Sequence, residues 1–207
     1  ALLGWNPGTS QEIFSLQELE HEFSIEGLSK SSAMFDIKKL NWMNGEYIRK
    51  MSLDDFHNKA LPYYKKVIKN DKIDLNKISA LLHARTEVFS DISSNVDFFE
   101  KLPDYDVNMY VHKKMKTNLD NSLISLKNSY EALENLQDWN EDSIRAALYG
   151  VIEKLGVKNG VVLWPVRTAL SGKQYTPGGA IEIADVLGRD ESLRRLHIGI
   201  EKLSNAK

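Results

Sequence analysis

Helix-forming patterns extend along almost the whole chain, and no segment alternates apolar and polar residues as a half-buried strand does. Apolar residues recur every three to four positions through most segments. Ser15, followed three residues later by Glu18, matches a capping box at a helix start. Asn140 precedes an amphipathic stretch that a glycine, Gly156, ends. The sequence therefore predicts an all-α protein.

Glycine and proline residues predict where these helices are interrupted. The Asn44–Gly45 step is expected to break a helix that begins at Ile37, and Pro62 to kink or break the next one. Pro103 predicts a turn between two consecutive helical bundles. Further helices are expected near 16–23, 75–89, 106–116, 118–137, 143–155, 161–170, 181–187 and 190–204.

Composition excludes several classes of protein. The chain has 207 residues, enough for one or two domains with their own cores. It has no cysteine, so disulfides and cysteine-ligated zinc are excluded, and it has no apolar stretch long enough to span a membrane. The net charge is only -2, with a pI near 6.3. Any contact with nucleic acid must therefore come from local basic patches.

No catalytic or metal-binding motif is recognisable. None of the five histidines has a histidine partner four residues away, as a helical metal site requires, and no glycine-rich phosphate loop follows a strand. Clustered carboxylates occur where helix caps and solvated faces place them. We therefore expect no catalytic residue, metal or cofactor in this chain. The histidines are His21, His57, His83, His112 and His197.

Two short segments imitate the nucleotide-binding motifs of class I aminoacyl-tRNA synthetases. LSKSS at 28–32 looks like the KMSKS loop, and HIGI at 197–200 looks like the HIGH motif. Their order is the reverse of the order in that family, and HIGI falls in an expected terminal helix. Both segments are therefore rejected as catalytic motifs.

Three longer segments resemble the bacterial glutamyl-tRNA synthetase family in their order and spacing. They are ALLGWNPG at 1–8, FDIKKLNWMNGEYI at 35–48, and PVRTALSGKQYTPGGAIEIADVLGRDESLRRL at 165–196. In that family the first two follow the true KMSKS loop, and the third belongs to the anticodon-recognition region. The resemblance covers effectively the whole chain, more weakly between about 60 and 135.

The resemblance implies a division of the chain into three parts. Residues 1–50 would be part of a stem-contact region, 51–104 a first anticodon-binding helical subdomain, and 105–207 a second. The parent would be a glutamate-tRNA ligase that uses ATP and Mg in a catalytic domain upstream of Ala1. We expect Ala1 to be an internal start, and this part alone to be inactive in aminoacylation.

The resemblance also implies partners and a location. The expected partners are the glutamate tRNA, through its anticodon arm and inner corner, and the catalytic domain of the same polypeptide. A monomer in the cytoplasm is expected, without a membrane partner. Trp5 is expected to be exposed where that catalytic domain would cover it.

Carried over from the family motif, one segment supplies most of the expected anticodon contacts. Arg167 matches the anticodon-contacting arginine, and Thr176 and Pro177 match residues that line the base pockets. Part of the family has leucine in place of Gly179, so the apolar contact there is missing or replaced. Arginine suits this role because its rigid donor fork meets base acceptors or phosphate and its plane stacks. The alternative for Arg167 is a helix C-terminal arginine that offsets the helix dipole.

Arg85 occupies the position at which strict family members place an arginine against the third anticodon base. Its alternative role is a solvated helix arginine. In the stem-contact region, Lys38, Lys39 and Asn41 would touch the RNA backbone, although a solvated face is an equal alternative. The basic runs at 65–69 and 112–116 leave the same two alternatives open. Three tryptophans are expected to be core or helix-staple residues: Trp42, Trp139 and Trp164.

Two other classes of function remain compatible with the residues. A helical protein-interaction scaffold would have no RNA specificity beyond weak, salt-sensitive binding. A self-contained enzyme using dispersed carboxylates would need a deep pocket with perturbed acids, and no motif supports one.

Overall fold

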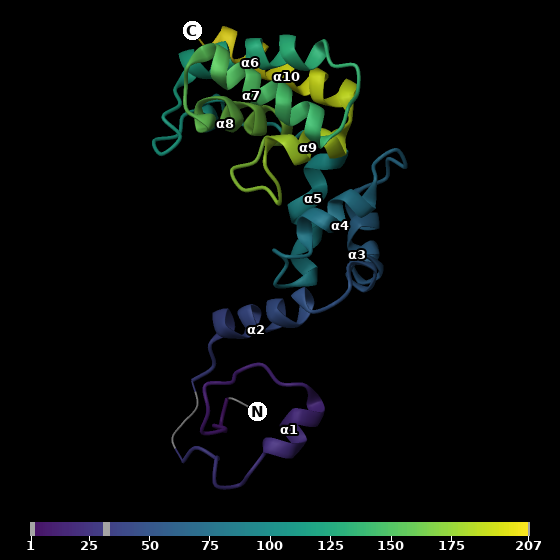
Figure 1. Cartoon of the computed structure of the whole chain (residues 1–207), viewed down its shortest axis with the longest axis vertical. Helices are drawn as coiled ribbons and strands as arrows, with labels where there is room; N and C mark the ends of the chain where they lie inside the picture. The colour runs from purple at the N-terminus through teal and green to yellow at the C-terminus, as the bar shows by residue number, and fades with distance from the viewer. Residues whose placement is uncertain (1–2, 31–33, 207) are drawn as a thin grey trace.

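The described residues form an elongated, mostly helical molecule, with the N-terminal segment and the last helix at opposite ends (Figure 1). The computed structural model describes residues 3–30 and 34–206. Ala1, where we expected an internal start, lies outside this range, as do Ser31 and Ser32 of the LSKSS segment. A small N-terminal unit occupies one end, and a helical bundle that includes the C-terminus occupies the other.

The described residues form ten α-helices and two short 3-10 helices, and their only β-type pairings are two isolated bridges. The prediction of an all-α fold is confirmed. None of the described helices has the length and apolar character needed to cross a bilayer. The elements are α1 (Leu16–Glu22), α2 (Ile37–Arg49), α3 (Leu53–Val67), α4 (Leu75–Leu82), η1 (Phe89–Asp91), α5 (Ile92–Glu100), η2 (Val107–Tyr110), α6 (Leu119–Glu134), α7 (Glu141–Leu155), α8 (Asn159–Ser171), α9 (Ala180–Leu187) and α10 (Arg189–Asn205).

The N-terminal unit has a small aromatic core around Trp5. The Trp5 ring packs against Phe14 and Phe23, and its Nε1 donates to the Ser24 carbonyl at 3.1 Å. Trp5 is only 3% exposed, so the expectation of an exposed Trp5 is wrong. The hydroxyl of Tyr47 in α2 donates to the Phe14 carbonyl at 2.7 Å, which ties this unit to α2.

Helix α2 runs unbroken through Asn44 and Gly45, so the expected interruption is wrong. Gly45 is buried, and a Cβ added there would lie 3.1 Å from Cγ of Glu87. The Asn44 amide donates to the Glu87 carbonyl. Tertiary packing thus outweighs the low helix propensity of these two residues. Trp42 is 39% exposed, which contradicts its expected place in the core.

The first bundle is formed by α3, α4 and α5. Helix α3 buries Phe56, Ala60 and Tyr64 on one face and continues past Pro62, so no break occurs there. Burial raises the pKa of Tyr64 to about 12, and its hydroxyl lies 2.9 Å from Oγ of Ser79 in α4. This buried bond fixes α3 against α4.

Two expected helices are shorter than their sequence patterns indicate. The helix expected at 75–89 ends at Leu82, whose carbonyl accepts hydrogen bonds from the Thr86 hydroxyl at 2.9 Å and the Arg85 amide at 2.8 Å. The helix expected at 106–116 is wrong apart from η2. A turn closed by a bridge between His112 and Thr117 follows η2 instead.

The second bundle packs α6 to α10 around one core, and its helix ends follow the predicted signals. Asn140 caps α7 as the acceptor for the Ser143 amide at 3.0 Å. Gly156 ends α7 in the left-handed conformation (φ 63°), where glycine avoids a Cβ clash. Gly188 (φ 75°) separates α9 from α10.

A buried arginine joins the two bundles. Arg195 of α10 is 0% exposed, and its Nη1 donates to the carbonyls of Phe98 at 2.8 Å and Leu170 at 2.7 Å. A second link pairs Lys77 of α4 with Asp185 of α9 at 2.7 Å. The bundles therefore form one joined platform. The subdomain division between 104 and 105 stays a prediction.

Candidate nucleic-acid interface

Arg167 lies on α8 with its guanidinium held on several sides. Nη1 donates to Oγ1 of Thr176 at 2.9 Å, and Nη2 donates to the Gln174 carbonyl at 3.0 Å. The guanidinium lies over the ring of Trp164, 4.3 Å from the ring centre, in cation–π geometry. Burial lowers the pKa of Arg167, but a guanidinium stays charged at neutral pH. The result is a fixed, partly dehydrated cation.

The segment from Thr176 to Gly179 forms the loop that faces this arginine. The Thr176 hydroxyl accepts from Arg167 and donates to the Gly178 carbonyl at 2.7 Å, while Pro177 is buried. Gly179 is exposed at the start of α9, and a Cβ there would lie 2.8 Å from a carboxylate oxygen of Glu182. The fold thus brings Arg167 and Thr176 into direct contact.

A hollow of about 420 Å³ opens beside Arg167, and its exposed lining is mostly apolar. Arg167 and Gly179 line it, whereas Thr176 and Pro177 do not. Thr176 therefore acts on the hollow through Arg167. The full lining is Met115, Arg145, Tyr149, Gly160, Leu163, Trp164, Arg167, Gly179, Ala180, Ile181 and Glu182.

Arg85 lies just beyond the end of α4, and both its expected role at the third anticodon base and its alternative role as a solvated arginine stay predictions. Its side chain is exposed, and Nη1 donates to the Leu81 carbonyl at 2.8 Å. The Leu81 side chain packs beside the Gly178 loop, because a Cβ added at Gly178 would lie 3.4 Å from Cδ1 of Leu81. The segments of Arg85 and Arg167 therefore lie next to each other, although no bond joins the two arginines directly.

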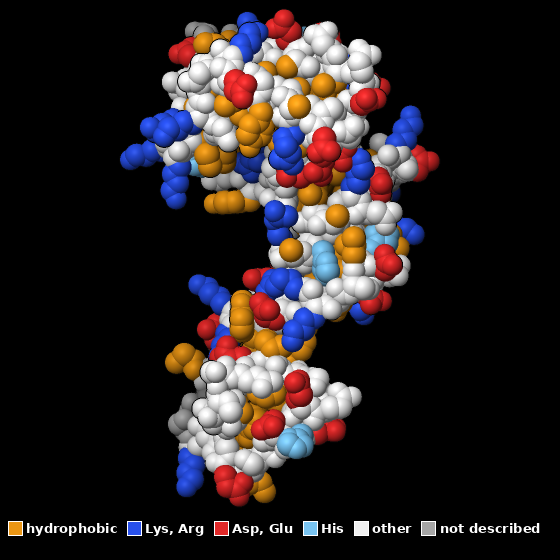
Figure 2. All heavy atoms as spheres, in the orientation of Figure 1, with side chains coloured by type: hydrophobic (Ala, Val, Ile, Leu, Met, Phe, Trp, Pro, Cys, Tyr) orange, Lys and Arg blue, Asp and Glu red, His pale blue; other side chains and the backbone are white. Residues whose placement is uncertain are grey.

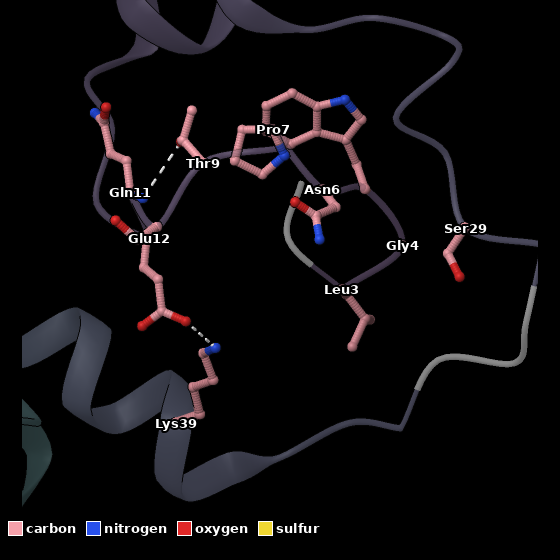
Figure 3. A pocket seen from close by; sticks show the side chains of 11 residues that line it. Leu3, Gly4, Asn6, Pro7, Thr9, Gln11, Glu12, Ser29 and Lys39 are labelled. Atoms are coloured by element: carbon pink, nitrogen blue, oxygen red, sulfur yellow. Dashed lines mark hydrogen bonds and ion pairs between the residues drawn. The ribbon is translucent and has the colours of Figure 1, made fainter.

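The expected stem-contact residues lie on α2, well separated from the second bundle (Figure 1). Lys39 forms an ion pair with Glu12, and both line a polar hollow of about 370 Å³ beside the Trp5 segment (Figure 3). Lys38 is exposed, and Asn41 is half-buried. The predicted contacts therefore fall into two separate regions.

Several residues of the Arg167 hollow were missed from the sequence. Arg145 and Tyr149 are four residues apart on α7, a spacing that puts them on one face. Trp164 is only partly buried, with its Nε1 donating to the Met109 carbonyl at 2.9 Å and its ring under Arg167. Tyr175, at 83% exposure, lies in the loop before Thr176 but does not line the hollow. Two spacings could have indicated these residues from the sequence. Arg145 and Tyr149 are separated by four positions, and Trp164 precedes Arg167 by three.

The described residues contain no group of three or more His, Cys, Asp or Glu side chains that could hold a metal ion. The side chains that line the hollow suit a different kind of ligand, because arginines donate hydrogen bonds and aromatic rings stack on planar groups. Two arginines, Arg145 and Arg167, and two aromatic residues, Tyr149 and Trp164, line this space together with the acidic Glu182.

Comparison with protein-family models decides the family. The anticodon-binding domain model matches residues 55–200. The chain belongs to the anticodon-binding domain family. The match includes the segments of both Arg85 and Arg167, so the anticodon-binding domain spans both bundles of the structure.

The relatives of this anticodon-binding domain are glutamate-tRNA ligases. Over 98% of this chain, the sequence is 60% identical to the enzyme of Clostridium acetobutylicum. Over 99% of this chain, it is 58% identical to the enzyme of Clostridium tetani. It spans 42% of the length of each of these relatives. A crystal structure of a glutamate tRNA ligase from Elizabethkingia meningosepticum, in complex with its amino acid, aligns with a TM-score of 0.78. That alignment has 25% identity and covers 98% of this chain and 39% of the other.

These relatives confirm the resemblance that the sequence motifs indicate. The chain corresponds to the C-terminal part of bacterial glutamyl-tRNA synthetases, in sequence and in helical fold.

Proposed function

We propose that this chain is the tRNA-binding part of a glutamate-tRNA ligase and that it recognises the anticodon of the glutamate tRNA. The observation that supports this most strongly is the Arg167 guanidinium, fixed between the Trp164 ring and the Thr176 hydroxyl at the edge of an apolar hollow. Proteins recognise single-stranded RNA by stacking unpaired bases and bonding their Watson–Crick edges. The hollow offers both kinds of contact.

Within this proposal, Arg167 donates hydrogen bonds to one anticodon base. Thr176 and Pro177 belong to the loop that holds the Arg167 guanidinium in place. Gly179 leaves room at the start of α9 for a base to approach the backbone. Tyr149 and Tyr175 add ring faces on which unstacked bases can lie. The apolar contact that leucine supplies in part of the family is replaced here by the open side of Gly179.

Arg85 recognises the third anticodon base in this proposal. Cytosine presents two neighbouring acceptors, O2 and N3, on its Watson–Crick edge, and these match the donor fork of arginine. Guanine presents donors at the equivalent positions, which a guanidinium cannot pair with. Arg85 is exposed and lies beside the Gly178 loop, so it can reach a base next to the one held by Arg167.

Lys38, Lys39 and Asn41 contact the backbone of the tRNA inner corner in the same proposal. Their position near the start of α2, away from the second bundle, fits a molecule that follows the RNA from its anticodon toward its acceptor stem (Figure 1). Such contacts fix register and carry no base information.

The ligase activity itself belongs to the part of the relatives that this chain does not match. We propose that this part holds ATP and Mg, and that it packs on the exposed apolar residues at the start of α2. Met34 is 90% exposed, Phe35 62% and Ile37 55%. A contiguous exposed apolar surface of this kind is typical of an interface. A monomer in the cytoplasm completes the proposal.

Equilibrium binding tests the function directly. The chain is titrated with a glutamate tRNA transcript and with the same transcript carrying G instead of C at the third anticodon position, at low and moderate salt. Several-fold tighter binding of the C form at both salts supports anticodon recognition. Equal binding that disappears with salt would mean contact with the backbone alone, and would support either relaxed specificity at the third base or the scaffold function.

A further inference from the structure

A loop rich in lysine, residues 112–117, lies beside the hollow, and base recognition gives it no role. The side chains of Lys113, Lys114 and Lys116 are exposed, and the structure records no ion pair for them among the described residues. Figure 2 shows Lys and Arg side chains gathered where the loop between η2 and α6 projects from the second bundle. This is a concentrated positive charge in a chain with a net charge of -2.

The loop has a defined shape. His112 and Thr117 pair through two backbone hydrogen bonds of 3.3 and 3.2 Å, and the His112 amide also donates to the Thr117 hydroxyl at 2.9 Å. Lys116 has a positive φ of 59°, and its backbone carbonyl accepts a hydrogen bond from the side-chain amide of Asn121 at 3.0 Å. The three lysines are therefore presented on a closed turn rather than on a free stretch of chain.

The same loop packs on the helix that carries Arg167. The His112 ring lies 4.0 Å, centre to centre, from the Trp164 ring, on which Arg167 also stacks. Met115 lies so close to α8 that a Cβ added at Gly160 would approach its sulfur to 2.8 Å, and Met115 lines the hollow. The lysines next to Met115 are thus positioned relative to the base-binding space.

We propose that Lys113, Lys114 and Lys116 bind the phosphate backbone of the RNA whose bases enter the hollow. This proposal rests on the proposed function and adds a sequence-independent contact to it. A base can reach a fixed arginine only when its own backbone is held in register, and phosphate contacts supply that register. Lysine suits this role because its ammonium is a point charge that accepts many phosphate geometries.

The lysines of the other basic run, at 65–69, are exposed as well, but the run lies neither on a closed turn nor beside the hollow. Lys66 lies over the Tyr63 ring at 4.9 Å, and Lys69 Nζ donates to the Lys65 carbonyl. Its helix, α3, contributes no residue to the lining of the hollow. The structure therefore separates two runs that look equivalent in the sequence.

A triple variant, K113Q/K114Q/K116Q, tests the proposal in titrations with the C and G transcripts. We expect the affinity for both transcripts to fall by the same factor, about tenfold or more at low salt. The slope of log affinity against log salt should fall by roughly 2, because each phosphate contact in a single strand contributes about 0.7. K113R/K114R/K116R should retain the wild-type affinity and slope.

A matched control removes three exposed lysines elsewhere, K101Q/K127Q/K154Q, none of which lines the Arg167 hollow. Far-ultraviolet circular dichroism and thermal unfolding check that both triples fold. If the loop triple behaves like the control triple, the proposal is wrong even where the wild type distinguishes C from G. If the wild type does not distinguish them, the proposed function fails, and the change in salt slope still decides the role of the loop. Absence of tRNA binding overturns both.

Discussion

The two regions with predicted RNA contacts differ in how firmly their side chains are held. At the Arg167 hollow, the guanidinium has two hydrogen bonds and an aromatic ring under it. On α2, Lys38 is exposed, and Lys39 is paired with Glu12 at a surface where both side chains are roughly half exposed. The first region is organised before RNA arrives, and the second is not.

This difference indicates how the two regions divide recognition. A side chain that is already fixed loses little conformational entropy on binding and rejects bases that do not match its donors. Exposed lysines adapt to the phosphate backbone and contribute affinity without selecting a sequence. We therefore expect specificity at the hollow and general affinity at α2.

Removing Arg195 should have the largest effect, because this residue joins the bundles that carry Arg85 and Arg167. Arg195→Met leaves the carbonyls of Phe98 and Leu170 without a donor and Glu191 without a buried partner. Breaking such a buried network costs about 3–5 kcal/mol in free energy of unfolding. Arg194→Met is the control, because the exposed Arg194 pairs with the same Glu191 and should cost at most about 1 kcal/mol. Urea unfolding measures both; equal losses would contradict the role of Arg195.

Arg167→Ala should cause the largest loss of RNA affinity. A well-formed arginine contact to a base is worth about 1–3 kcal/mol, which corresponds to roughly tenfold to a hundredfold in the dissociation constant. Arg167→Lys should recover only part of this, because lysine lacks the planar fork. Fluorescence anisotropy with labelled tRNA measures the effect. Arg194→Ala serves as the control. If the Arg167→Ala variant binds RNA as tightly as this control, Arg167 does not contact the RNA.

Arg85→Gln should change specificity more than affinity. We expect the preference for C over G at the third anticodon position to fall by about 1–2 kcal/mol, because glutamine cannot reproduce the paired donors that arginine presents to cytosine. Binding of the G transcript should change little. Parallel titrations give the ratio of the dissociation constants for the G and C transcripts. An unchanged ratio would mean that Arg85 is a solvated side chain that does not contact the base.

The double substitution K38Q/K39Q should have the smallest effect. Exposed charges of this kind contribute at most about 1 kcal/mol, so we expect weaker binding by a few-fold, equally for both transcripts. The salt slope should fall by about 0.7–0.9 for each phosphate that the variant no longer neutralises. A change in the C to G ratio would contradict the division between the two regions.

Local signals were sufficient for much of the fold. The capping box at Ser15 and the helix boundaries at Asn140 and Gly156 depend on residues adjacent in sequence, and all are confirmed. The continuity of α2 through Gly45 was not predictable, because it depends on packing against Glu87, more than 40 residues away.

The burial of Trp5 and the early end of α4 also depend on contacts that local sequence signals do not reveal. Trp5 is buried by Phe14 and Phe23, which come together only when the N-terminal unit closes. The helix expected at 75–89 ends at Leu82, where the Arg85 backbone amide donates to the Leu82 carbonyl in a tighter turn, and apolar periodicity does not reveal this turn.

The sequence predicted part of the candidate site, but neither its remaining residues nor its geometry. The family motif singled out Arg167 and Thr176, and the structure adds their 2.9 Å hydrogen bond and the Trp164 ring beneath. The hollow itself is lined from α7, α8, α9 and the 112–117 loop, and it exists only after these segments pack. Arg145 and Tyr149 join the site for this reason.

Binding of an isolated anticodon hairpin tests the central claim most directly. The chain is titrated with a short stem-loop that carries the anticodon arm of the glutamate tRNA, and with the same stem-loop in which the three anticodon bases are changed. If the hollow recognises the anticodon, the hairpin alone retains the full discrimination measured with whole tRNA, and Arg167→Ala reduces it. Equal binding of both hairpins, or discrimination that appears only with whole tRNA, would contradict the account.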